Sequence, residues 1–156
     1  GKIDVLVNNA GLGHFKPVEE ITLDEWDEMM EVNVRGTFLF SKAVIPHFKQ
    51  QKSGFIVTVQ SDVSTRPVAT GAGYVASKFA QEGFTASMRK ELRPHGIRVS
   101  NVYPGLIDTA FHSPENKKRQ GWLQPEDVAL AIKQILEAPA HVVMDELVIH
   151  PSSQEY

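Results

Sequence analysis

The segment SDVSTRPVATGAGYVASK, residues 61–78, contains three side chains whose types suit acid–base chemistry. A tyrosine hydroxyl can exchange a proton, a nearby lysine ammonium can lower the pKa of that hydroxyl, and a serine hydroxyl can stabilise charge that develops on a substrate oxygen. Tyr74 and Lys78 are four positions apart, so a helix would place them on one face. This pair alone is a weak signal, and its meaning depends on the elements that position it beside Ser61.

Length and composition indicate one globular domain. The 156 residues suffice for a single core, and we expect residues 1–156 to fold as one domain. The formal charge of −3 gives no electrostatic reason to bind nucleic acid, and no apolar run reaches the ~18–20 residues that span a bilayer. The N-terminus shows no secretory leader, and the absence of cysteine excludes disulfides and thiolate metal sites. We therefore expect a cytoplasmic protein without nucleic-acid or membrane partners.

Strand-like and helical runs alternate along the chain, which predicts an α/β fold with a parallel sheet and covering helices. The expected strands cover residues 3–9, 55–61, 97–103 and 146–150. The expected helices cover Thr22 to Lys52, Gly73 to Arg93, and Pro125 to about residue 136. Thr22 and Glu25 form a capping box for the first helix, and Pro46 predicts a kink or a frayed end within it. Residues 108–124 are polar and are expected to form a loop.

The candidate residues follow the ends of the predicted strands. Asn8 and Asn9 end the first strand, Ser61 ends the second, and Pro104-Gly105 closes the third. Ligands of open α/β sheets bind at the carboxyl ends of the strands. The helix that carries Tyr74 and Lys78 starts from this same edge, so we expect all these residues to line one cleft.

Five motifs in register resemble the short-chain dehydrogenase/reductase family over essentially the whole chain. They are the NNAG motif Asn8-Asn9-Ala10-Gly11, the asparagine motif Asn33-Val34-Arg35-Gly36, Ser61, the YxxxK pair Tyr74 and Lys78, and the PG motif from Pro104 to Thr109. The resemblance implies a Rossmann-like parallel sheet with flanking helices. It also implies an oxidoreductase that transfers a hydride between NAD or NADP and a small carbonyl or alcohol substrate.

The resemblance assigns a role to each matching residue. The catalytic residues would be Asn33, Ser61, Tyr74 and Lys78. Tyr74 would be the general acid and base, Lys78 would bring its pKa from about 10 towards neutral, and Ser61 would polarise the substrate oxygen. Lys78 would also hold the nicotinamide ribose, and Asn33 would position a water that relays protons to Lys78. The cofactor-binding residues would be Asn8, Ala10, Gly11, Tyr74, Lys78, Pro104, Gly105, Ile107 and Thr109.

Several of these residues have simpler interpretations. Asn8 could merely end a strand, Asn33 could be an ordinary polar helix residue, and Ser64 competes with Ser61, although only Ser61 has the family's separation from Tyr74. The six histidines show no metal-ligand spacing, so no metal site is expected. His14 and His112 fall in loops near the expected cleft and are candidates for touching the substrate. Phe111 and the short loop around it suggest a modest apolar substrate.

The chain departs from the family pattern in its first part. The glycine-rich TGxxxGxG turn that holds the cofactor pyrophosphate is not in this sequence, and the family's first three strands are not represented. The residue that selects between NAD and NADP therefore cannot be identified, and the strand at residues 3–9 would be an exposed apolar edge. Either the chain is part of a longer enzyme, or it is a truncated relative. Asp62, directly after Ser61, adds an unusual negative charge near the cleft.

Two other functions fit parts of the sequence. The first is a non-catalytic α/β module that associates through its two long helices, Thr22 to Lys52 and Gly73 to Arg93, which form subunit interfaces in the family. The same resemblance implies a homodimer or homotetramer for the enzyme itself. The second is a relative of the sugar epimerases, which share YxxxK; the NNAG and PG motifs argue against it. Cofactor binding distinguishes the enzyme from the module.

Overall fold

The protein folds around one parallel sheet of four strands in the order β1-β2-β3-β4. The computed structural model describes residues 1–111 and 119–154. The strands are β1 (Val5–Asn8), β2 (Gly54–Val59), β3 (Ile97–Pro104) and β4 (Glu146–Ile149). Leu6 pairs with Ile56, Ile56 with Val99, and Val102 with Leu147. The predicted parallel sheet is confirmed, and the observed strands start or end within a few residues of the expected limits.

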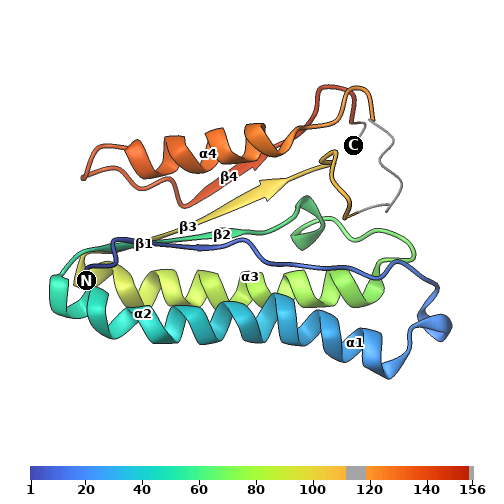
Figure 1. The fold of residues 1–156 in the computed structure, drawn as a ribbon, viewed down its shortest axis with the longest axis horizontal. Helices are drawn as coiled ribbons and strands as arrows, with labels where there is room; N and C mark the ends of the chain where they lie inside the picture. Colours follow the sequence, from blue (N-terminus) through green and yellow to red (C-terminus); the bar gives the residue numbers. More distant parts are fainter. Residues whose placement is uncertain (112–118, 155–156) are drawn as a thin grey trace.

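Helices cover both faces of the sheet (Figure 1). Their bounds are α1 (Leu23–Met29), α2 (Thr37–Gln51), α3 (Ala72–Leu92) and α4 (Pro125–Glu137), with single 3-10 turns η1 (Val18–Glu20), η3 (Asp62–Ser64) and η4 (Arg93–His95). In Figure 1, α1, α2 and α3 lie below the sheet and α4 lies above it. The C-terminal ends of the strands point to the same end of the molecule as the start of α3.

The prediction of one uninterrupted α-helix from Thr22 to Lys52 is wrong for the middle of this segment. The capping box of Thr22 and Glu25 is present, but a π-helical segment, η2 (Met30–Gly36), separates α1 from α2. Pro46 lies inside α2, which continues to Gln51. π-Helical segments within α-helices are frequent at functional sites, and η2 contains the buried Asn33.

Two apolar clusters hold the layers together. The first lies between the sheet and the pair α2 and α3; its members are Val44, Phe48, Ile56, Met88, Leu92, Ile97 and Val99. The second lies under α4; its members are Phe55, Val57, Val102, Ala131 and Ile135. Along β2, Ile56 belongs to the first cluster and its neighbours Phe55 and Val57 to the second, as expected of a strand buried on both faces.

The first strand is an exposed edge, as predicted. Val5 and Val7 keep 40% and 39% of their surface exposed, whereas Ile56 and Val57 of the neighbouring β2 are fully buried. An apolar edge strand of this kind is a template for pairing with a further strand. In the described ranges, no helix combines the length and apolarity needed to cross a bilayer.

Candidate active site

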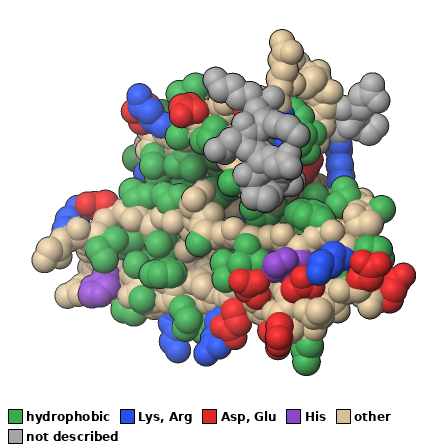
Figure 2. Space-filling model, turned by 45° about the vertical axis from the view of Figure 1, so that its right-hand side comes forward, with side chains coloured by type: hydrophobic (Ala, Val, Ile, Leu, Met, Phe, Trp, Pro, Cys, Tyr) green, Lys and Arg blue, Asp and Glu red, His purple; other side chains and the backbone are tan. Residues whose placement is uncertain are grey.

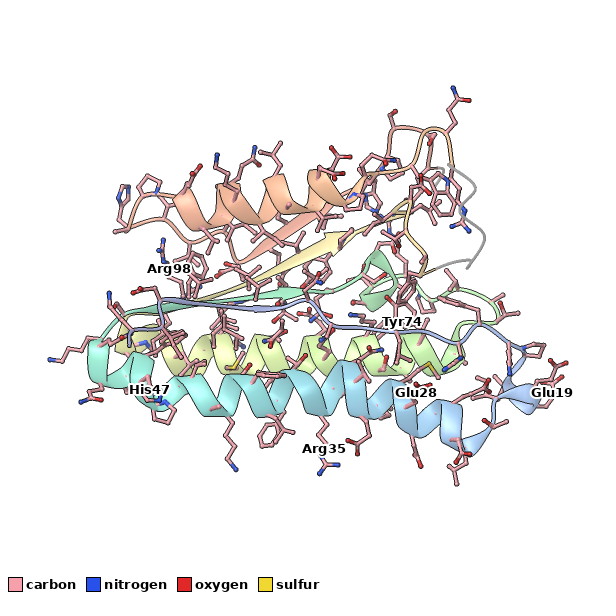
Figure 3. All side chains as sticks on the ribbon, viewed as in Figure 1. Glu19, Glu28, Arg35, His47, Tyr74 and Arg98 are labelled. Carbon is pink, nitrogen blue, oxygen red and sulfur yellow. The ribbon has the colours of Figure 1, made fainter. Side chains whose placement is uncertain are left out.

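The predicted functional residues meet at the carboxyl edge of the sheet. Ser61 follows β2, Tyr74 and Lys78 occupy the first two turns of α3, and Gly105 follows β3. Figure 3 shows Tyr74 beside the start of α3, at the end of the molecule to which the strands point, whereas Arg98 lies at the opposite end. Tyr74 and Lys78 are buried, with 6% and 3% of their surface exposed. The convergence predicted from strand order is therefore present.

Ser61 holds the hydroxyl of Tyr74. Its side chain caps η3 by accepting the Val63 amide proton at 3.4 Å. Its single hydroxyl proton can be donated either to Asp62 Oδ1, at 3.2 Å, or to the Tyr74 phenol. Burial raises the pKa of Tyr74 to about 12; the Ser61 hydrogen bond opposes this rise and the Asp62 charge adds to it. Tyr74 is therefore protonated, and ready to donate, throughout the neutral range.

Lys78 is directed towards amide and carbonyl oxygens. Its Nζ donates to the Val59 carbonyl at 3.1 Å and to Gln81 Oε1 at 2.9 Å, and it lies 5.9 Å from the centre of the Tyr74 ring. Burial lowers the pKa of Lys78 to about 8, because desolvation disfavours the ammonium. An ammonium has three donors, so one remains available for a ligand hydroxyl beside the two observed bonds.

The prediction that Lys78 brings the pKa of Tyr74 near neutral is wrong for this arrangement. The pKa of Tyr74 rises, and its causes are burial, Ser61 and Asp62. The attraction between ammonium and phenolate would lower the pKa of Tyr74, but the cost of desolvating both buried groups opposes it. That cost dominates here, since each side chain keeps only 6% or less of its surface exposed.

Asn33 anchors the loop after β1. This fully buried side chain donates from Nδ2 to the Leu12 carbonyl at 2.8 Å and to Ser77 Oγ at 2.9 Å, and its Oδ1 accepts the Leu12 amide proton at 2.9 Å. The three bonds join η2, the loop and α3. Asn33 thus fixes the position of the loop that follows the NNAG motif.

The NNAG residues divide into two groups. Asn8 is buried and donates to Ser41 Oγ of α2 at 3.2 Å, so its side chain joins the sheet to a helix. Ala10 and Gly11 are exposed at the edge. A Cβ on Gly11 would lie 3.3 Å from Asn33 Oδ1 and 3.7 Å from Lys78 Nζ, so the backbone passes close to both groups. This close approach suits a ligand that lies against the backbone.

The C-terminal residues hold the PG motif. Pro104 ends β3, the Gly105 amide donates to the Ile149 carbonyl at 2.9 Å, and the Leu106 amide donates to Gln154 Oε1 at 3.0 Å. A Cβ on Gly105 would collide with the side chains of Gln154 and His150. Further along, Ile107 forms a bridge with Leu123, and Thr109 Oγ1 accepts the Phe111 amide proton at 3.3 Å.

Gln154 is a site residue that the sequence did not reveal. While its Oε1 holds Leu106, its Nε2 donates to Asp62 Oδ2 at 2.7 Å, and His150 Nε2 lies 3.6 Å from the same oxygen. Asp62 in turn accepts from Ser61. One side chain near the C-terminus therefore links the PG motif to the neighbour of the candidate catalytic serine. No motif marks Gln154, so only the tertiary structure identifies it.

An aromatic cluster surrounds Tyr74. The ring centres of Phe15 and Phe111 lie 5.3 Å and 5.4 Å from that of Tyr74, and 6.2 Å from each other. The rival serine, Ser64, is 2% exposed and donates to Gln60 Oε1 at 3.4 Å, so it does not share this position. Phe111 thus lies against the predicted proton donor, and Phe15 is a second apolar neighbour that the sequence did not indicate.

Acidic side chains gather over η1 and α1 near this end of the molecule. Figure 2 shows them along the lower right of the space-filling view, beside a histidine and a basic side chain. Glu25 accepts from Lys16 Nζ at 2.5 Å, and Glu28 is hydrogen-bonded to His14 Nε2 at 2.8 Å. His14, a candidate for touching the substrate, is thus engaged with these carboxylates. His112 lies outside the described residues. Across residues 1–111 and 119–154, no group of three or more histidine, aspartate or glutamate side chains could hold a metal ion.

Replacing Gln154 by leucine is expected to lower the free energy of unfolding by about 1–3 kcal/mol, because the Leu106 amide and Asp62 both lose a hydrogen-bond partner. Chemical denaturation measures this loss. The matched control is Gln50→Leu, an exposed position on α2, which should change the free energy of unfolding by less than about 0.5 kcal/mol. If both substitutions changed the free energy of unfolding equally, the hydrogen bonds of Gln154 would not contribute to stability.

Sequence comparison identifies the relatives of this chain. A family model of short chain dehydrogenase matches residues 1–120. An uncharacterized oxidoreductase of Staphylococcus aureus (strain MRSA252) is 32% identical over 151 residues, which are 97% of this chain and 65% of the relative. The chain therefore spans about two-thirds of the length of the curated relatives it matches.

Solved structures with the same fold contain nicotinamide cofactors. An alcohol dehydrogenase from the archaeon Thermococcus sibiricus, complexed with 5-hydroxy-NADP, matches with a TM-score of 0.92 and 34% identity over 100% of this chain and 66% of its own. A serine dehydrogenase complexed with NADP+ matches with a TM-score of 0.93 and 30% identity, over 99% of this chain and 67% of its own. A 3-ketoacyl-(acyl-carrier-protein) reductase from Brucella melitensis, complexed with NADH, matches with a TM-score of 0.88 and 31% identity, over 97% of this chain and 68% of its own. These matches support NAD or NADP as the cofactor of the fold, and the chain belongs to the short-chain dehydrogenase family.

Proposed function

We propose that this chain carries the catalytic part of an oxidoreductase that transfers a hydride between NAD(P)(H) and a carbonyl or alcohol. The observation that carries the proposal is the meeting of Ser61, Tyr74 and Lys78 at the carboxyl edge of the sheet. Support comes from the solved relatives, which are complexed with 5-hydroxy-NADP, NADP+ and NADH. A cytoplasmic location accompanies this proposal.

The residues at the edge fit a nicotinamide cofactor. The backbone at Gly11 passes close to Lys78 Nζ, and that ammonium keeps one donor beyond its two observed bonds. In the proposed function, Lys78 uses this donor to hold a ribose hydroxyl. The PG motif from Gly105 to Thr109 lies along the neighbouring strand end, where its backbone would flank the nicotinamide.

The chain's own part of the reaction is proton transfer and orientation. When bound, NAD(P)H supplies the hydride that adds to the carbonyl carbon. The Ser61 hydroxyl hydrogen-bonds the carbonyl oxygen, and Tyr74 donates its proton to that oxygen as negative charge develops there. The raised pKa of Tyr74 keeps this proton in place at neutral pH, which suits reduction. Alcohol oxidation needs the deprotonated phenol and is therefore expected to speed up as the pH rises.

The aromatic cluster favours a substrate with an apolar part. Phe15 and Phe111 both pack against Tyr74, so a carbonyl placed at the Tyr74 hydroxyl would lie next to apolar surface. A small ketone or aldehyde with an aliphatic or aromatic substituent fits this position better than a polyhydroxylated sugar does.

Association through the long helices is a second proposed property. Phe38, Leu39 and Phe40 of α2 and Phe79 of α3 keep 42% to 63% of their surface exposed, and an apolar cavity of about 280 Å³ opens between α2 and α3. Exposed apolar area of this kind favours a homodimer or homotetramer. Light scattering coupled to size exclusion tests it: Phe40→Glu should yield a smaller species than the unchanged protein. The same mass for both would exclude this face.

Cofactor binding and turnover test the proposed enzyme directly. Fluorescence titration measures the binding of NADPH and of NADH, and the loss of absorbance at 340 nm follows the reduction of a panel of apolar ketones and aldehydes. The expected result is saturable binding of at least one cofactor and turnover of one or more carbonyls. Absence of binding to both cofactors would support the non-catalytic module instead.

A further inference from the structure

We propose that Gln81 is a positioning residue that orients the Lys78 ammonium by bridging it to the backbone carbonyl of Asn33. Gln81 lies on α3 about one turn after Lys78 and is fully buried. This inference rests on the proposed function, because it assigns the residue that fixes the orientation of the candidate catalytic lysine.

The contacts of Gln81 leave one orientation for its amide. Oε1 accepts from Lys78 Nζ at 2.9 Å, and Nε2 donates to the Asn33 carbonyl at 2.8 Å and to Thr37 Oγ1 at 2.6 Å. An ammonium only donates and a carbonyl only accepts, so the oxygen must face Lys78 and the nitrogen must face Asn33. The amide therefore forms a fixed bridge between α3 and η2.

The Asn33 carbonyl accepts two side-chain hydrogen bonds, one of them from the Gln81 bridge. It accepts from Gln81 Nε2 at 2.8 Å and from Thr37 Oγ1 at 2.9 Å, and a carbonyl oxygen has two lone pairs. The resemblance assigns this region to a water that relays protons to Lys78. Here a side-chain amide makes the link, and an amide holds its protons instead of passing them on. In this arrangement the Gln81 amide gives the Lys78 ammonium a fixed dipole.

Few groups in the environment of Lys78 accept a hydrogen bond from its ammonium, and Gln81 is one of them. The groups that face the ammonium are Tyr74 from α3, the Val59 carbonyl from β2 and the Gly11 backbone from the loop after β1, and Asp62 adds a charge near Tyr74. Two oxygens accept from the ammonium, and the other one, from Val59, belongs to the backbone. A substitution of Gln81 therefore removes one of the two acceptors of the Lys78 ammonium and leaves the backbone of β2 intact.

The test measures the titration of Lys78 itself by NMR of ¹³C-labelled lysine side chains. The signal is assigned from its loss in Lys78→Met. Gln81→Met, which keeps the length of the side chain but removes its dipole, is expected to lower the pKa of Lys78 by about one pH unit, and Gln81→Glu to raise it. Gln134→Met, exposed on α4, is the matched control and should leave the titration unchanged.

Two results would overturn the inference: an unchanged Lys78 titration in both folded variants, or shifts of the same sign in both. Circular dichroism establishes folding, and Gln81→Glu keeps the test open if Gln81→Met does not fold. In an active protein, the pH profile of kcat/KM should move in the same direction as the Lys78 titration. Failure of the proposed function has a different signature, since an unchanged protein that reduces no carbonyl would still show the shifts in the NMR titration.

Discussion

Replacing Tyr74 by phenylalanine is expected to lower kcat for carbonyl reduction by roughly 10²–10⁴-fold, the usual contribution of a positioned general acid. The substitution removes the proton donor but keeps the ring between Phe15 and Phe111. Ser61 keeps its bonds to Asp62 and to the Val63 amide, so the local structure should persist. The free energy of unfolding should change by about 1 kcal/mol or less, the value of one hydrogen bond. Steady-state kinetics and urea denaturation measure the two effects.

Tyr103→Phe is the matched control for this prediction. Tyr103 is also buried, but its hydroxyl donates to Glu82 Oε2 at 2.6 Å and accepts from Asn101 Nδ2 at 3.3 Å, away from the Ser61 and Lys78 groups. Its loss should cost about 1–2 kcal/mol of stability and leave kcat nearly unchanged. If Tyr74→Phe retained normal turnover, or if both variants lost it equally, Tyr74 would not be the proton donor.

The parts of the fold that follow from local patterns were predictable. Apolar runs of strand length alternate with helical runs, and this pattern gives a parallel sheet with its loops at one carboxyl edge. The position of Ser61, Tyr74 and Lys78 at this edge follows from topology and from helix spacing alone. The capping box at Thr22 depends on residues three positions apart and was therefore also visible in the sequence.

The links between elements were not predictable in the same way. Gln81 and Gln154 belong to no motif, and their partners lie 48 positions or more away at Asn33 and Asp62. The π segment between α1 and α2 places Asn33 and Thr37 against α3, a requirement that arises only when the helices pack. The pKa of Tyr74 depends on burial, which a charge count along the sequence does not contain.

Replacing Lys78 by methionine is expected to abolish turnover, because it removes the cation that would hold the cofactor ribose in the proposed function. Its effect on stability should depend on pH in a specific way. The pKa of Lys78 is about 8 in the folded chain against an ordinary value of 10.5. Between these values the unfolded chain binds more protons than the folded one, so the stability of the unchanged protein rises with pH across this window. Lys78→Met lacks this rise.

The measurable quantity is therefore the difference in free energy of unfolding between Lys78→Met and the unchanged protein, taken at pH 7 and again near pH 10. Between these two pH values the variant should lose roughly 2.5 kcal/mol of stability relative to the unchanged protein, at ~1.4 kcal/mol for each unit of pKa change. The lost hydrogen bonds to Val59 and Gln81 impose a cost that does not vary with pH and cancels from the comparison. Lys90→Met, exposed on the same helix, should show no such pH dependence. A difference that stays constant from pH 7 to pH 10 would mean that the folded protein accommodates the ammonium as well as water does, and that burial does not lower the pKa of Lys78.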